Sequence, residues 1–285
     1  MGTHRPRVWL VTGASSGFGR AVTEYALYNN EIVSAAVRNP ETLGDLGHKY
    51  GPDHLLVVPC NVASTEQITD AFTATKMKFG HIDIVLHCAG YAIVGEIEGT
   101  PEQTARDLFD VNFWATANVS KEAVKIFREQ GHGGRLLNIS SGAGLVGLIA
   151  SGYYSASKHA VEGLTECLAK EVIPSWNIKI SILEPGAFKT RAHSENCVIL
   201  PAHDAYKTSE APTFHVRNHF EEGSSTWGDV VKAAKKIFEF TKLENPPLRW
   251  QIGREAIEGI KAQMESILEE SKVLENWSDD LLMEG

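Results

Sequence analysis

The sequence predicts an α/β protein in which a doubly wound parallel sheet is flanked by helices. Short apolar runs alternate with longer segments of helical periodicity, which is the pattern of βαβ units. A glycine-rich turn follows the first apolar run, where folds of this kind bind phosphate groups. No apolar run approaches the roughly 18 residues of a membrane span, so these runs are expected to be strands.

Composition and charge narrow the class of protein. The chain has 285 residues, 43% of them hydrophobic, which is typical of a globular protein. An α/β fold of this length often forms one domain, and we expect a single domain over residues 1–285. The formal net charge of −9 argues against nucleic acid as a partner. Four cysteines without a C-x-x-C pair and the lack of a signal-peptide segment predict a cytoplasmic protein.

The first half of the chain supplies four predicted strands. Residues 8–11 form the first apolar run, and a glycine-rich turn and a helix follow it. Residues 32–37 and 55–58 are the second and third strands, and residues 82–86 are the fourth. The residues at helical spacing that predict a helix over 65–79 are Ile68, Phe72, Thr75 and Phe79.

The second half continues the alternation as far as Pro185. The expected order is a long helix over 112–130, a strand over 135–139, a helix over 154–172 and a strand over 178–183. Right-handed crossovers between these strands give the doubly wound topology. Residues 189–225 lack a clear period. We interpret them as a long excursion with short helices that acts as a substrate lid, the alternative being a disordered surface loop.

Two helices are expected after the excursion. One covers residues 227–240, and the other begins near Glu255. The last helix carries an apolar stripe at steps of three, four and three, formed by Ile257, Ile260, Met264 and Ile267. Because the stripe covers barely two heptads, we expect it to pack on its own domain rather than in a coiled coil.

The glycine-rich turn predicts a dinucleotide site. Glycines allow a tight turn and let the backbone approach a pyrophosphate, and the following helix offers free N–H groups at its N-terminus. The strand before the turn and the helix after it favour this interpretation over an ordinary glycine-rich turn. The predicted cofactor-binding residues in the turn are Gly13, Ser15, Ser16, Gly17, Phe18 and Gly19.

Arg38 indicates which dinucleotide is bound. An NAD site usually places an acidic residue at the end of the second strand, where it binds the ribose 2′-hydroxyl. Here Arg38 takes that position, and a guanidinium can bind a 2′-phosphate through two hydrogen bonds. The sequence therefore favours NADP(H) over NAD, although a solvated surface arginine would look the same.

Three further residues indicate acid–base chemistry. Tyr154 and Lys158 are four residues apart, so they share one face of a helix. A nearby ammonium lowers the pKa of a phenol, and a lysine can also bind ribose hydroxyls. Ser141, at the end of the fifth predicted strand, can hold a substrate oxygen near the tyrosine. Without Ser141 and the glycine-rich turn, the pair would be an ordinary exposed helical pair.

Together these residues resemble the short-chain dehydrogenase/reductase family, in its single-domain branch with a Rossmann-like sheet, over nearly the whole chain. The resemblance implies that Ser141, Tyr154 and Lys158 are catalytic and that Asn112 completes the tetrad by shaping a helix and holding a water in the proton relay. It adds further cofactor contacts, which are Asn61, Val62, Ala89, Gly90, Asn112, Tyr154, Lys158, Pro185, Gly186, Phe188 and Thr190.

The sequence departs from the family pattern in two places. Residues 87–90 read His-Cys-Ala-Gly where the family usually has Asn-Asn-Ala-Gly, and Asn61 stands where an aspartate is common. Residues 91–95, residues 246–249 and the closing helix most resemble hydroxysteroid and retinol dehydrogenases. In the family, the helices that begin near Asn112 and Tyr154 commonly form a dimer interface, which implies a homodimer or homotetramer.

The resulting hypothesis is an NADP(H)-dependent oxidoreductase that moves a hydride between nicotinamide and a carbonyl or secondary alcohol of a hydrophobic small molecule. The alternatives are isomerisation, dehydration or cyclisation on the same fold, and a dinucleotide sensor, which would not need all three catalytic side chains. Residues that could line an apolar pocket, or belong to the core, are Leu145, Val146, Leu148 and Ile149. The spacing of His193, His203, His215 and His219 predicts no metal site.

Overall fold

The computed structural model describes residues 5–188, 197–222, 227–279 and 281. Its centre is a sheet of seven parallel strands in the order β3–β2–β1–β4–β6–β7–β9. The strands are β1 Val8–Thr12, β2 Ile32–Val37, β3 Leu55–Pro59, β4 Ile84–His87, β6 Gly134–Ile139, β7 Ile178–Pro185 and β9 Arg249–Ile252. The strand order reverses between β1 and β4, which confirms the predicted doubly wound topology and leaves a crevice at their carboxyl ends.

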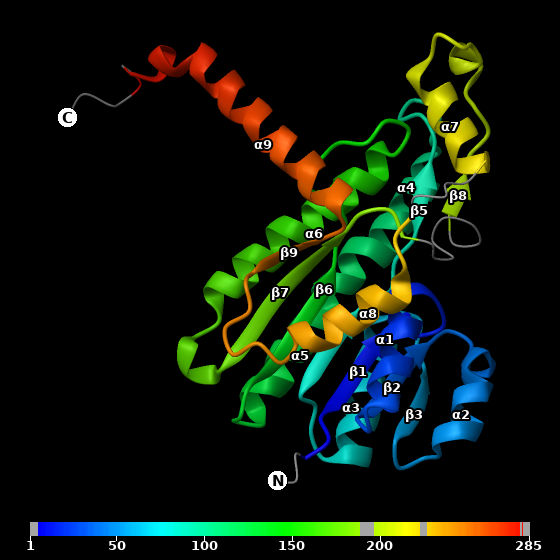
Figure 1. The fold of residues 1–285 in the computed structure, drawn as a ribbon, viewed down its shortest axis with the longest axis vertical. Helices are drawn as coiled ribbons and strands as arrows, with labels where there is room; N and C mark the ends of the chain where they lie inside the picture. Colours follow the sequence, from blue (N-terminus) through cyan, green and yellow to red (C-terminus); the bar gives the residue numbers. More distant parts are fainter. Residues whose placement is uncertain (1–4, 189–196, 223–226, 280, 282–285) are drawn as a thin grey trace.

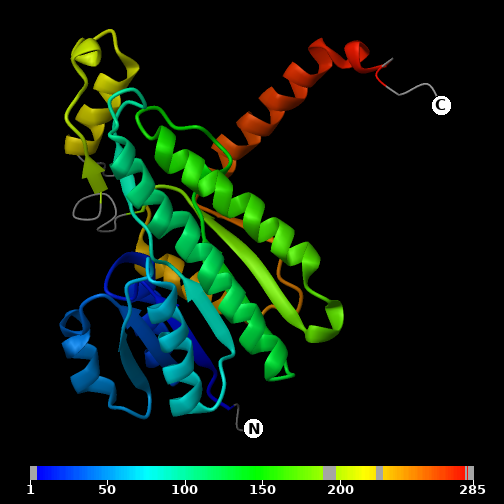
Figure 2. The same ribbon diagram turned by 180° about the vertical axis from the view of Figure 1, so that it is seen from behind.

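Helices cover both faces of this sheet. Helices α1 and α8 lie on one face (Figure 1), and α3, α5 and α6 lie on the other (Figure 2). The helices are α1 Gly17–Tyr28, α2 Gly44–Tyr50, α3 Thr65–Phe79, α4 Glu102–Phe109, α5 Ala115–Glu129, α6 Gly152–Glu171, α7 Pro212–Glu222, α8 Val230–Phe240 and α9 Arg254–Val273.

Each face of β1 contributes to a separate part of the core. Trp9 points to the side of α8, where its ring stacks on Phe238 with 5.7 Å between centroids. Leu10 points to the opposite side and joins Phe72 of α3 and Phe127 of α5. Because both faces are covered, the strand is buried at every position and apolar as far as Val11, which is why the sequence shows continuous apolar runs rather than alternation.

Several predicted boundaries were wrong. The helix expected to begin at Asn112 begins ten residues earlier, at Glu102, and passes through a π-helical turn, Asp110–Trp114, into α5. The fourth strand, Ile84–His87, begins two residues later and ends one residue later than predicted. Strand β9 was not predicted, because its four residues are only half apolar and pair solely with β7.

The excursion at 189–225 is more regular than the sequence suggested. Residues 189–196 and 223–226 lie outside the described residues. Between them, β8 Cys197–Ile199 pairs in parallel with β5 Ala92–Val94, and α7 adds an eleven-residue helix. Figure 1 shows this unit at one end of the molecule, above the carboxyl ends of the strands.

The last helix leaves the body of the protein (Figure 1). Its first turns are packed, and Ile260 is 8% exposed. The other residues of the stripe, Ile257, Met264 and Ile267, are 36%, 39% and 43% exposed. The expectation that the stripe packs on its own domain therefore holds for Ile260 and was wrong for the other three residues. Over the described ranges, none of the helices has the length and apolar character needed to cross a bilayer.

Candidate active site

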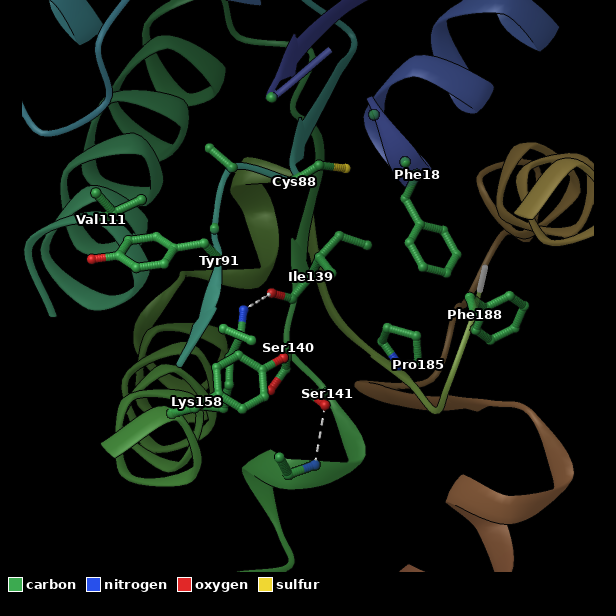
Figure 3. A pocket seen from close by; sticks show the side chains of 18 of the residues that line it. Phe18, Cys88, Tyr91, Val111, Ile139, Ser140, Ser141, Lys158, Pro185 and Phe188 are labelled. Carbon is green, nitrogen blue, oxygen red and sulfur yellow. Dashed lines mark hydrogen bonds between the residues drawn. The ribbon is translucent and has the colours of Figure 1, made fainter. Parts of the chain in front are cut away.

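A cavity of about 800 Å³ lies at the carboxyl ends of the strands and extends from the glycine-rich turn to the first turns of α6 and α9. Aromatic side chains of Phe18 and Phe188 stand on one side, with Tyr91 and Val111 on the other (Figure 3). The predicted site residues that line it are Gly13, Ser15, Ser16, Gly17, Phe18, Gly19, Arg38, Asn61, Val62, Ala89, Gly90, Ser141, Tyr154, Lys158, Pro185, Gly186 and Phe188.

The turn between β1 and α1 depends on its glycines. Gly13 and Gly17 have φ angles of +66° and +55°, which side chains disfavour. A Cβ atom on Gly13 would lie 2.8 Å from the backbone nitrogen of Ala89, and one on Gly19 would overlap the carbonyl oxygen of Gly13. The chain can therefore pass close to the cavity, and α1 presents its N-terminus there. This cradle fits a pyrophosphate.

Arg38 lies at the end of β2, at the edge of the cavity. Its side chain is exposed and has no ion pair or hydrogen bond over the described ranges of the chain. Asn61 faces the same region, and its Oδ1 accepts a hydrogen bond from the Ala63 N–H at 3.2 Å. The end of β2 therefore presents a guanidinium, rather than a carboxylate, to the cavity.

The catalytic candidates come from two elements. Ser141 follows β6 and its Oγ accepts a hydrogen bond from the Ala143 N–H at 3.2 Å, while Tyr154 and Lys158 lie one turn apart on α6. The Ser141 hydroxyl lies close to the Tyr154 phenol. The Lys158 Nζ donates to the Ile139 carbonyl oxygen at 3.0 Å (Figure 3). The arrangement places two hydroxyls and an ammonium at one end of the cavity.

Burial controls the protonation of these groups. Burial lowers the pKa of Lys158 to about 8. It raises the pKa of Tyr154, while the nearby Ser141 hydroxyl opposes this. The Lys158 ammonium is 5.9 Å from the centre of the phenol ring and donates to a backbone carbonyl, and the lowering of the tyrosine pKa by this lysine stays a prediction.

Asn112 is in the π-helical turn and does not line the cavity. Its Oδ1 accepts from the Tyr91 N–H at 3.0 Å, and its Nδ2 donates to the Tyr91 carbonyl at 3.0 Å and to Ser157 Oγ at 3.1 Å. A Cβ on Gly90 would lie 3.1 Å from Asn112 Oδ1 and 3.7 Å from Lys158 Nζ. Asn112 therefore ties the loop after β4 to α6, directly behind the lysine.

Part of the cavity wall, formed by α9, was not predicted from the sequence. The first turns of α9 contribute Ala256, Gly259 and Ile260. Glu255 also lines the cavity, and its Oε1 accepts a hydrogen bond from the Ala187 N–H at 3.1 Å. The small residues at 256 and 259, three apart on one helix face, were the available signal. Of the four residues proposed for an apolar pocket, Val146 and Leu148 line the cavity, whereas Leu145 and Ile149 do not.

Other predicted residues are placed elsewhere. Thr190 and His193 lie outside the described residues, as does the side chain of His219. In the excursion, the ring of His203 accepts a hydrogen bond from the Ala205 N–H, and the ring of His215 is hydrogen-bonded to the Ser209 carbonyl oxygen. Over the part of the chain that the structure describes, no three metal-ligating side chains converge.

Comparison with known proteins decides the family. The model of the short chain dehydrogenase family matches residues 7–197. The chain belongs to this family. An uncharacterized oxidoreductase of Schizosaccharomyces pombe is 36% identical over 92% of this chain and 87% of its own length. A 3-ketodihydrosphingosine reductase of Bacteroides thetaiotaomicron is 34% identical over 87% of this chain and 88% of its own length. This short-chain dehydrogenase is an oxidoreductase whose subfamily these relatives do not resolve.

Solved short-chain dehydrogenase structures share the fold. One from Streptomyces avermitilis has a TM-score of 0.88 and 33% identity, and covers 98% of this chain and all of its own. A family member from Burkholderia phymatum in complex with NAD has a TM-score of 0.79 and 22% identity, over 95% and 97% of the two chains. One from Burkholderia cenocepacia in complex with NADP has a TM-score of 0.73 and 22% identity, over 95% and 98%.

Proposed function

We propose that this short-chain dehydrogenase is an NADP(H)-dependent oxidoreductase that acts on a carbonyl or secondary alcohol of a hydrophobic small molecule. The observation that carries the proposal is the convergence of Ser141, Tyr154 and Lys158 at one end of a cavity whose other end is the glycine-rich turn. A single ligand in this cavity would contact both the phosphate cradle and the acid–base group.

Tyr154, Ser141 and Lys158 have separate roles in carbonyl reduction. A bound nicotinamide supplies the hydride. Tyr154 donates its phenolic proton to the substrate oxygen, and Ser141, whose hydroxyl lies close to that phenol, holds the oxygen in place. Lys158 would bind the ribose hydroxyls from its buried position next to Gly90. In the direction of alcohol oxidation the tyrosine takes the proton back.

The walls of the cavity favour an apolar substrate. The side chains near the catalytic end include Val111, Val146, Leu148, Val198 and Ile260. The similar protein of Bacteroides thetaiotaomicron is named a 3-ketodihydrosphingosine reductase. A carbonyl compound with an extended apolar part fits both observations.

The choice of NADP(H) rests on Arg38, which faces the cavity without an ion-pair partner over the described ranges. The solved relatives include complexes with NADP and with NAD, so the fold alone accommodates either. We also infer a cytoplasmic homodimer or homotetramer, with a lid at 189–225. Resemblance to the family supports the assembly, and the position of β8 beside the cavity supports the lid.

The test follows absorbance of the reduced nicotinamide while the protein turns over hydrophobic aldehydes and ketones. We expect oxidation of NADPH in equimolar amount with the alcohol formed. Tyr154→Phe keeps the ring but removes the transferable proton, so it should lower kcat by at least ~100-fold and leave NADPH affinity within ~3-fold. Product formed without net consumption of NADPH would instead support isomerisation or dehydration.

A further inference from the structure

A cluster of ionisable side chains behind the catalytic serine has no part in the mechanism above. Glu162 of α6 and Glu184 of β7 have side-chain exposures of 3% and 0%. Over the described residues, Arg249 of β9 is the cation that pairs with both. Its Nε lies 3.2 Å from Glu162 Oε2 and 3.5 Å from Glu184 Oε1. Its Nη2 is used by the more exposed Glu166, at 2.6 Å.

Glu166 is also paired with Lys170, at 2.5 Å, so Arg249 is the guanidinium that the two buried carboxylates share. Because the same Nε atom of Arg249 lies within 3.5 Å of an oxygen of each, the carboxyl groups of Glu162 and Glu184 lie close to each other. Each also has a buried Oε1 atom that lacks a hydrogen-bond donor in the part of the chain that the structure describes. Two buried carboxylates in such contact repel each other strongly unless a proton lies between them. Burial raises the pKa of Glu184 to about 7, and that of Glu162 is raised as well.

The pair joins the two segments that build the reaction centre. Glu162 lies one helical turn beyond Lys158 on α6, and Glu184 immediately precedes the turn at Pro185. Glu162 also packs against the residue before Ser141. A Cβ on Gly144 would lie 2.5 Å from Ser140 Oγ and 3.1 Å from Glu162 Oε1. A change in the distance between the two carboxyl groups would therefore move α6 relative to the carboxyl end of β7.

We propose that Glu162 and Glu184 share one proton, and that this shared proton positions the catalytic helix against the segment that meets the nicotinamide. Both are positioning residues. The ionisable groups that face the pair are Lys158 and Glu166 from α6 and Arg249 from β9. A neutral amide also faces it, because Gln251 Nε2 donates to Glu184 Oε2 at 2.6 Å. Loss of the proton would leave two repelling carboxylates and separate the two segments.

The test variant is Glu184→Gln, whose amide has the shape of the protonated acid and cannot ionise. The control is Glu166→Gln, which removes the more exposed carboxylate that pairs with the same arginine. A raised pKa means that the folded state binds more protons than the unfolded state between pH ~4.5 and ~7. The stability of the unmodified protein should therefore fall as the pH rises through this window. Between pH 5 and 8 its Tm should fall by at least ~4 °C more than that of Glu184→Gln, whereas Glu166→Gln should follow the unmodified protein.

A binding measurement tests the positioning role, and this part rests on the proposed function. Between pH 6 and 8.5 the Kd for NADPH should rise at least ~3-fold more in the unmodified protein than in Glu184→Gln. The Tm comparison needs no cofactor, so it decides on the shared proton even if NADPH does not bind. Glu162→Gln serves as a second variant and should also flatten the Tm profile. Equal pH profiles for Glu184→Gln and the unmodified protein, or an equal change in Glu166→Gln, would overturn the proposal.

Discussion

At the scale of single residues, cofactor choice depends on Arg38. Because its side chain is exposed and faces the cavity, it can be exchanged without disturbing the core. Replacing it with aspartate removes a charge-assisted contact to a 2′-phosphate and introduces repulsion. We expect Arg38→Asp to weaken NADPH binding by ~10- to 100-fold, equivalent to about 1.5–3 kcal/mol, and to leave NADH within ~3-fold. Titration with each nucleotide checks this, and equal affinities in the unmodified protein would contradict it.

Lys158 illustrates a conflict between stability and function. Burial lowers its pKa to about 8, below the unfolded value of about 10.4, so the charged form destabilises the fold below pH 8 and this cost disappears towards pH 10.4. Lys158→Met should therefore be more stable than the unmodified protein at pH 7, by up to about 3 kcal/mol. The gain should vanish by pH 10. The affinity for NADPH should fall at least ~10-fold. Urea unfolding at each pH measures the stability, and titration with NADPH measures the affinity. A variant less stable at pH 7 would show that the bond to Ile139 outweighs the burial of charge.

The candidate site residues could be predicted from the sequence where a short local pattern contains them. The glycines of the turn and the spacing of Tyr154 and Lys158 are visible in the sequence, and the structure brings them to one cavity. Glu162 and Glu184 were not predictable, because an isolated acidic residue in a sequence gives no sign that it will be fully buried. Their environment depends on α6, β7 and β9 coming together.

At the scale of elements, the unit of β8 and α7 is joined to the body by the pairing of β8 with β5 and by a buried ion pair between Arg217 and Glu96. Arg217 of α7 donates to both carboxylate oxygens of Glu96, at 3.1 and 2.6 Å, and to the Leu200 carbonyl. Only 2% of the Glu96 side chain is exposed, and its pKa is lowered to about 2, chiefly by the bonds from Arg217. This contact links residues 121 positions apart and so could not be predicted from local sequence.

Breaking that pair should loosen the unit and spare the sheet. Arg217→Met leaves a buried carboxylate unpaired, which costs about 3 kcal/mol. Hydrogen-exchange protection over residues 212–222 should fall by ~100-fold or more, with amides of β1 and β4 unchanged. Lys207→Met is the matched control, because its pair with Asp204 is exposed and should contribute little. Similar loss of protection in both variants would mean that the ion pair is not the anchor.

Element boundaries were less predictable than element types. The helix that precedes Asn112 was missed because residues 102–109 have two buried positions, Ala105 and Leu108, and the other side chains, apart from Phe109, are polar. Strand β9 likewise has no clear pattern of apolar residues, and it forms a strand by pairing with β7. In both cases a tertiary contact, rather than periodicity, decides the structure.

At the scale of the whole molecule, the site is assembled from most of the chain, from Gly13 in the first turn to Ile260 in the last helix. The parallel topology explains this, because every strand brings its carboxyl end to the same edge of the sheet. The sequence predicted the central sheet well for this reason, since alternating elements leave few topologies. It could not predict that α9 would turn one end into the cavity and extend its other end away from the core.

The two ends of α9 should therefore contribute very differently to folding. Ile260 is 8% exposed, and Ile260→Ser should lower the free energy of unfolding by about 2–4 kcal/mol. Met264 and Leu268 are 39% and 62% exposed, so serine at both positions should cost less than about 1 kcal/mol together. Urea unfolding of dilute protein measures both effects. The loss of stability on replacing Met264 and Leu268 could instead equal the loss at Ile260 and grow with protein concentration. Since only association depends on concentration, that result would mean that these two side chains are buried between chains.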